Sequence, residues 1–149
     1  MLRTLFPSDL NALLMIEEAV HIAPWSRETF LTCFEAGCIG WVVEIDKKIV
    51  GFVLIAVQSG ECHILNLCLL HAHQRQGWGK KLIQQVFAHT KEKNIGIIYL
   101  EVRRSNTRAI NLYRKSGFIL VGERKGYYPA PGGSEDALIF ARSLHDYLP

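Results

Sequence analysis

The sequence lacks the features that mark secreted, membrane-spanning and disulfide-rich proteins. Its four cysteines form no C-x-x-C pair and no regular framework, which favours free thiols in a reducing compartment. No run approaches the roughly 18 uninterrupted apolar residues that span a bilayer. The opening Met1-Leu2-Arg3-Thr4 has no basic patch followed by an apolar run, so we expect no signal peptide and a cytoplasmic protein.

Dense charge of one sign is also missing. The net charge of +3 is mild and no Lys/Arg block is present, so we expect neither nucleic acid nor a membrane as a direct partner. Cys68, His71 and His73 are the residues that suggest a metal site. A structural metal site needs about four converging ligands and the sequence offers no second paired set, so we expect no metal.

The composition is that of one soluble globular domain. The 149 residues are 49% hydrophobic and 21% charged, with no repeat and no Pro/Gly/Ser-rich linker. This length is enough to bury a single continuous core. We therefore expect one domain over residues 1–149.

The order of periodic segments predicts an α/β protein with a mixed sheet flanked by helices. Two short helices come first, the second capped by Ser26, and a hairpin turning at 46–48 follows. Further on, the pattern predicts strands over 63–70 and 97–102 and helices over 77–93 and 106–116, the last stopped by Gly117. Final strands over 118–121 and 137–141 would enclose a loop that contains Tyr127 and Tyr128.

The segment from Leu65 to Lys80 is the most informative, because a buried strand enters a two-glycine turn and a long helix follows at once. The first amides of a helix lack internal partners and carry the positive end of its dipole, so such a turn can cradle a pyrophosphate. Arg75 and Lys80 would add positive charge. The alternative is a plain strand-to-helix turn that uses glycine for its torsion angles. G-x-G-x-x-G and G-K-[ST] patterns are both absent.

Two motifs resemble those of the GNAT acetyltransferase family. Gln74-x-x-Gly77-x-Gly79 is similar to its coenzyme A pyrophosphate signature, and the residues from Asn106 to Phe118 are similar to its motif N-x-x-A-x-x-L-Y-x-x-x-G-F. Four further segments resemble the bacterial ribosomal-protein-alanine N-acetyltransferases within that family: Pro24-Trp25-Ser26, Leu100-Glu101-Val102-Arg103, Tyr127-Tyr128-Pro129 and Glu135-Asp136-Ala137. Trp78 and Leu70-His71-Ala72-His73 depart from the family pattern.

The resemblance implies the GNAT acyl-CoA N-acyltransferase fold and a site that binds acetyl-CoA without a metal. Glu101 would be the general base, acting through water, and Tyr113 the acid that protonates the leaving thiolate. From the residues alone, Glu101 has the alternative of an ion pair with Arg103 or Arg104, and Tyr113 that of core packing. The expected contacts to the coenzyme are Leu67, Cys68 and Leu69, through a backbone amide that holds the oxyanion, together with Arg75, Gln76, Gly77, Trp78, Gly79, Lys80 and Asn106. From the residues alone, Asn106 would cap the helix that follows it, and the two roles are compatible.

Three aromatic residues in expected loops, Trp25, Tyr127 and Tyr128, suit the walls of a peptide groove. Cys68 has apolar neighbours in sequence, so we expect direct transfer and no acetyl-enzyme. The resemblance implies acetylation of a protein N-terminus, an alanine of a ribosomal protein. The alternatives are acetylation of a lysine side chain or small amine, and a non-catalytic acetyl-CoA-binding module. Retention of both Glu101 and Tyr113 argues against the module.

Overall fold

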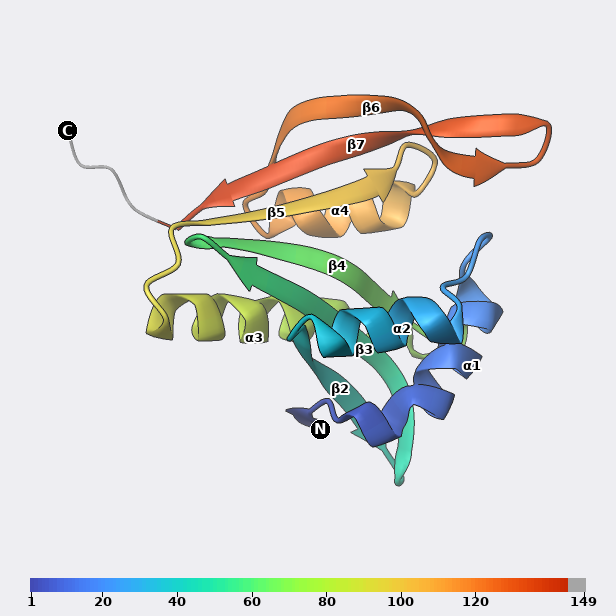
Figure 1. The fold of residues 1–149 in the computed structure, drawn as a ribbon, viewed down its shortest axis with the longest axis vertical. Coiled ribbons are helices and arrows are strands. Elements are labelled where there is room, and N and C mark those ends of the chain that lie inside the picture. The colour runs from blue at the N-terminus through green and yellow to red at the C-terminus, as the bar shows by residue number, and fades with distance from the viewer. Residues whose placement is uncertain (145–149) are drawn as a thin grey trace. The chain divides into compact units, whose positions relative to one another are not determined.

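The computed structural model of the protein describes residues 1–144, which form two compact units (Figure 1). The first unit contains residues 1–56 and 65–86, and the second contains residues 57–64 and those from 87 onwards. Among the described residues, no helix is long and apolar enough to cross a membrane. The sequence-based prediction of one domain stays a prediction, and each unit is described separately.

The first unit is a sheet covered by two short helices. Its strands are ordered β1 (Leu2–Thr4), β2 (Ile39–Ile45), β3 (Lys48–Gln58) and the second half of β4 (Glu61–Leu69). The helices are α1 (Leu10–Val20) and α2 (Arg27–Glu35), and the start of α3 (Trp78–Glu92) follows a 3-10 turn, η2 (His71–His73). One apolar cluster joins the helices to the strands through residues such as Leu13, Phe30 and Phe52, all inaccessible to solvent.

Local chemistry explains where these elements begin. Ser26 caps α2 by accepting a hydrogen bond from the Thr29 amide at 3.2 Å, as the sequence predicts. Asp9 precedes α1, but its carboxylate binds Arg3 and the Phe6 amide in place of the first helical amides. β1 was not predicted from the sequence, because three residues are too few to show a period.

The second unit orders its strands as the first half of β4, β5 (Ile97–Arg103), β7 (Gly133–Ser143) and β6 (Ile119–Ala130), with α4 (Thr107–Lys115) before β6. β4 and β5 are parallel, and the other neighbours are antiparallel. No residue of β5 is exposed, in line with its apolar sequence. Gly117 takes φ +91° after α4, the left-handed conformation expected of a helix stop.

The last two strands correct one sequence-based prediction. Tyr127, Tyr128 and Pro129 do not lie in a loop: β6 and β7 form one long hairpin that pairs Tyr128 with Glu135 (Figure 1). The charges and glycines from Gly122 to Gly126 are typical of a loop, but this stretch is part of β6. The pairing of β6 with β7 shifts register on either side of it, which accommodates the stretch within the strand. Among the described residues of this unit, β6 is paired on one side only, and Ile119, Leu120 and Val121 are exposed along it.

Candidate active site

The glycine turn of the first unit has the shape that the sequence predicts. Arg75 and Gly77 both adopt positive φ, +63° and +88°, and α3 begins at Trp78 immediately afterwards. The Gln74 side chain donates a hydrogen bond to the Leu69 carbonyl at 2.9 Å, which ties the turn to the end of β4. The first backbone amides of α3 have no partner within the helix and suit a phosphate group.

Four of the other residues proposed to bind the coenzyme lie at the end of this turn and at the start of α3: Gln76, Trp78, Gly79 and Lys80. Gln76 donates to the Ala72 carbonyl at 3.3 Å, and Lys80 is exposed next to the buried Gly79. The Lys81 ammonium lies 4.6 Å from the centre of the Trp78 ring, so this tryptophan carries a cation on its face. Contact between these residues and coenzyme A stays a prediction.

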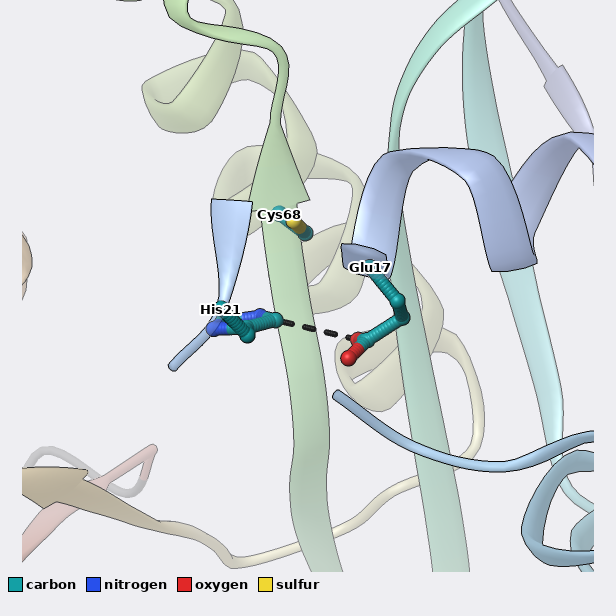
Figure 2. Close-up of side chains that lie close together, drawn as sticks. All are labelled: Glu17, His21 and Cys68. Atoms are coloured by element: carbon teal, nitrogen blue, oxygen red, sulfur yellow. Dashed lines mark ion pairs between the residues drawn. The ribbon is translucent and has the colours of Figure 1, made fainter. Parts of the chain in front are cut away.

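A buried polar cluster lies beside the end of β4, where the sequence places the oxyanion amide (Figure 2). The Glu17 carboxylate, from α1, accepts hydrogen bonds from the Asn66 side-chain amide and, at 3.0 Å, from the Trp25 backbone amide. His21 Nε2 lies 3.5 Å from Glu17 Oε1 and 3.3 Å from Asn66 Oδ1. The cluster therefore joins Trp25 to the strand that contains Leu67, Cys68 and Leu69.

Cys68 is buried within this cluster, with 2% of its surface exposed. Burial, and then the charge of Glu17, raises the pKa of its thiol well above the ordinary value. Since the thiolate is the nucleophilic form, this environment supports the expectation that Cys68 forms no acetyl-enzyme. His71 and His73 are not grouped with it among the described residues: Cys68 lies with Glu17 and His21.

Glu101 lies in β5 of the second unit and forms an ion pair with Arg124, a residue that the sequence did not suggest as its partner. Arg124 of β6 places Nε 3.3 Å from Glu101 Oε2, whereas Arg103 pairs with Glu135 and Arg104 pairs with Glu123 and Asp136. The proposed alternative pairing with Arg103 or Arg104 is therefore wrong. Within residues 1–144, the buried Glu101 Oε2 accepts no hydrogen bond, and its contact with Arg124 is an ion pair alone.

Tyr127 and Tyr128 lie next to Glu101 and its cation. Their rings meet edge to face with centres 5.0 Å apart, and the guanidinium groups of Arg124 and Arg103 lie over Tyr127 and Tyr128, at 5.3 and 4.6 Å. Burial, followed by the nearby Glu101 charge, raises the pKa of Tyr128 to about 12. Its phenol thus stays protonated at neutral pH, beside the carboxylate.

Tyr113 and Asn106 lie at the two ends of α4. Asn106 accepts a hydrogen bond from the Ala109 amide at 3.2 Å, so its predicted role as a cap is confirmed, and its contact with the coenzyme stays a prediction. Tyr113 is buried with its ring edge-on to Phe118, the centres 5.9 Å apart. Packing and proton donation are compatible roles for this ring.

Sequence reasoning missed four residues that the structure joins to the predicted ones: Glu17, His21, Asn66 and Arg124. Glu17 gave a detectable signal, because a glutamate on the apolar face of a predicted helix is out of place unless it is paired. Arg124 gave none, since it belongs to a stretch that reads as a loop.

The chain belongs to the acetyltransferase (GNAT) family, whose pattern it matches over residues 8–118. It is 37% identical to the ribosomal protein bS18-alanine N-acetyltransferase of Haemophilus ducreyi, over 97% of this chain and 100% of the relative. It is 33% identical to the enzyme of the same name from Escherichia coli K12, over 90% of each chain. The crystal structure of the Escherichia coli ribosomal-protein-S18-alanine N-acetyltransferase matches with a TM-score of 0.92 and 31% identity, over 99% of this chain and 95% of that one. The GNAT fold predicted from the sequence is thereby confirmed.

Proposed function

We propose that this protein transfers the acetyl group of acetyl-CoA to the N-terminal α-amine of a ribosomal protein that begins with alanine. The observation that carries the proposal is the state of Glu101: its buried Oε2 forms an ion pair with Arg124 without a hydrogen bond, beside two tyrosines whose rings meet edge to face. A buried carboxylate oxygen without a hydrogen bond needs an explanation, and a catalytic role is one. The relatives named alanine N-acetyltransferases match nearly the whole chain, which supports this substrate class.

The reaction proceeds by direct attack within a ternary complex. Glu101 takes a proton from the substrate ammonium through a water molecule, and the neutral nitrogen attacks the thioester carbon. A backbone amide in the segment from Leu67 to Leu69 stabilises the oxyanion of the tetrahedral intermediate. The carbon–sulfur bond then breaks, and the Tyr113 phenol protonates the departing thiolate. The nitrogen loses its second proton, which reprotonates the Tyr113 phenolate through water, and the proton taken up by Glu101 is released to solvent.

The chemistry of deprotonation suits an α-amine better than a lysine side chain. A peptide α-amine has a pKa near ~8, whereas a lysine amine near ~10.4 costs roughly 3 kcal/mol more to deprotonate at neutral pH. One carboxylate that acts through water is a modest base, which suits the easier substrate. Trp25 in the first unit, and Tyr127 and Tyr128 in the second, are the aromatic residues that we expect to contact the residues after the terminal alanine.

The test is acetylation of a short peptide that begins with alanine and also contains lysine. We expect one acetyl group per peptide, on the terminal nitrogen, and no transfer when that terminus is chemically blocked. Mass spectrometry of the product locates the modification. Acetylation of the blocked peptide would assign the enzyme to lysine side chains, and binding of acetyl-CoA without turnover on any amine would leave a non-catalytic module.

A further inference from the structure

Glu17 is a carboxylate with no exposed surface in the core of the first unit. A buried charge destabilises the folded state unless it is paired and hydrogen-bonded. The role of Glu17 is therefore to be found in the groups that its carboxylate contacts. Oε2 accepts a hydrogen bond from the Trp25 backbone amide, and Oε1 accepts one from the Asn66 side-chain amide. Figure 2 shows a further contact, the ion pair between Oε1 and His21 Nε2. One side chain therefore fixes two segments that are distant in sequence.

The first of these segments carries Trp25. α1 ends at Val20, and residues 21–26 have no regular structure, so their backbone depends on contacts from outside. The Glu17 carboxylate supplies one at the Trp25 amide, and the Trp25 ring packs against Phe30 with centres 5.1 Å apart. Trp25 is thus held at both its backbone and its ring.

The second segment is the end of β4. Asn66 directly precedes Leu67, the first residue of the strand segment that is proposed to supply the oxyanion amide. The hydrogen bonds through Glu17 therefore set the position of Trp25 relative to this strand. This geometry lies entirely within the first unit.

A metal site is the competing interpretation, because Glu17, His21 and Cys68 each offer a ligand atom and these lie within 4.8 Å of one another. The hydrogen bonds argue against it: a cation would have to displace both the Trp25 amide and Asn66 from the carboxylate. Metal binding would also have to remove the proton of the Cys68 thiol, whose pKa is raised by burial and by the Glu17 charge.

We propose that Glu17 is a positioning residue for the peptide substrate: through its hydrogen bonds to the Trp25 amide and Asn66, it holds Trp25 where the first residues of the acetyl acceptor bind. This inference rests on the proposed function, in which Trp25 lines the peptide groove. Since Trp25 would contact the peptide equally in the ground state and the transition state, its displacement raises the peptide KM and leaves kcat unchanged.

The test is Glu17→Gln, which keeps the size of the side chain and replaces one acceptor oxygen by a donor. Either the Trp25 amide or Asn66 then faces an N–H group. We expect the KM for an alanine peptide to rise at least tenfold, while kcat and the KM for acetyl-CoA stay within twofold of the parent. Hydrogen exchange at the Trp25 amide, followed by NMR, should become faster. Glu18→Gln is the matched control, an exposed neighbour with the same change, and should leave all four quantities unaltered.

A second variant separates positioning from stability. In Glu17→Gln combined with Asn66→Asp, the amide at position 17 can donate to the carboxylate at 66 and still accept from the Trp25 amide. We expect this double variant to recover most of the peptide KM. A peptide KM in Glu17→Gln that equals the Glu18→Gln value would overturn the proposal. A loss of activity confined to kcat would also overturn it, and so would a double variant whose peptide KM does not recover. Failure of both Glu17 variants to fold would show a structural role and would overturn it as well.

Failure of this inference is distinguishable from failure of the proposed function. If the parent enzyme does not acetylate the alanine peptide, the substrate assignment is wrong and the inference falls with it. If the parent is active and only the peptide KM is insensitive to Glu17, the function stands and the inference alone is wrong.

Discussion

Tyr113 is the residue whose two roles the structure makes separable. Its ring packs edge-on against Phe118, and this contact does not use the phenolic oxygen. Tyr113→Phe therefore preserves the packing and deletes the proton donor. We expect kcat to fall by roughly ten- to ten-thousand-fold with little change in acetyl-CoA affinity, measured by steady-state kinetics and calorimetry.

The control for this change is Tyr99→Phe in the same unit. Tyr99 is half-buried and stacks on His63 with ring centres 5.4 Å apart, outside the proposed site. It should keep parental turnover. If Tyr113→Phe also keeps parental turnover, Tyr113 serves packing alone and another group protonates the thiolate.

At the scale of elements, the turn before α3 depends on Gly77. Its φ of +88° is strained for any residue with a Cβ, although the space around it is open. Gly77→Ala should therefore cost about 1 kcal/mol of unfolding free energy through backbone strain. We also expect it to weaken acetyl-CoA binding, since a methyl group would then lie in the turn that is proposed to bind the pyrophosphate. Acetyl-CoA would raise the melting temperature of the variant less than that of the parent.

Gly37, after α2, is the matched control: its φ is +89° and its surroundings are equally open. Gly37→Ala should lose similar stability and keep the full rise in melting temperature with acetyl-CoA. If the two variants respond to acetyl-CoA alike, Gly77 shapes the turn without contacting the coenzyme.

The helices could be predicted from sequence because their signals are local. Ser26, Asn106 and Gly117 act within a few residues, and the structure confirms all three. The hairpin of β6 and β7 could not be predicted from the sequence. Cross-strand pairing with Glu135 and its neighbours holds the stretch around Gly126 in the strand, and the local sequence does not show this pairing.

The candidate site also has a part that local sequence predicts and a part that it does not. The glycine turn and the Tyr113 helix are continuous motifs, and the sequence predicted both. The Arg124 partner of Glu101 and the Glu17 cluster depend on residues that meet only after the strands have paired, and a single sequence has no spacing that encodes such pairs.

At the scale of the whole molecule, the ionisation of buried thiols makes the free energy of unfolding fall at alkaline pH. Burial raises the pKa of Cys62 from about 9 to about 12. The folded state holds this proton more tightly than the unfolded state, so the contribution is complete below pH ~9 and is lost as the pH rises towards ~12. We expect unfolding free energy to fall by up to about 1.4 kcal/mol per pH unit in this window from Cys62 alone.

Urea unfolding at a pH of about 7.5 and of about 10.5 measures this loss. Cys62→Ala removes the titrating group, so the alkaline loss should be smaller in the variant even though its stability near neutral pH is lower. Equal losses in the two proteins would show that the Cys62 thiol ionises alike in the folded and unfolded chains.

The one-sided pairing of β6 has a consequence for concentrated preparations. An edge strand with exposed Ile119, Leu120 and Val121 offers a template on which a second molecule can extend the sheet. Glu123, Arg124 and Lys125 follow directly, and the register shift after Leu120 interrupts the ladder, so charge and irregularity oppose such growth. Salt screens charges at the surface but not apolar contacts. High ionic strength should therefore promote self-association through this strand, and low-salt buffers should keep the protein monodisperse.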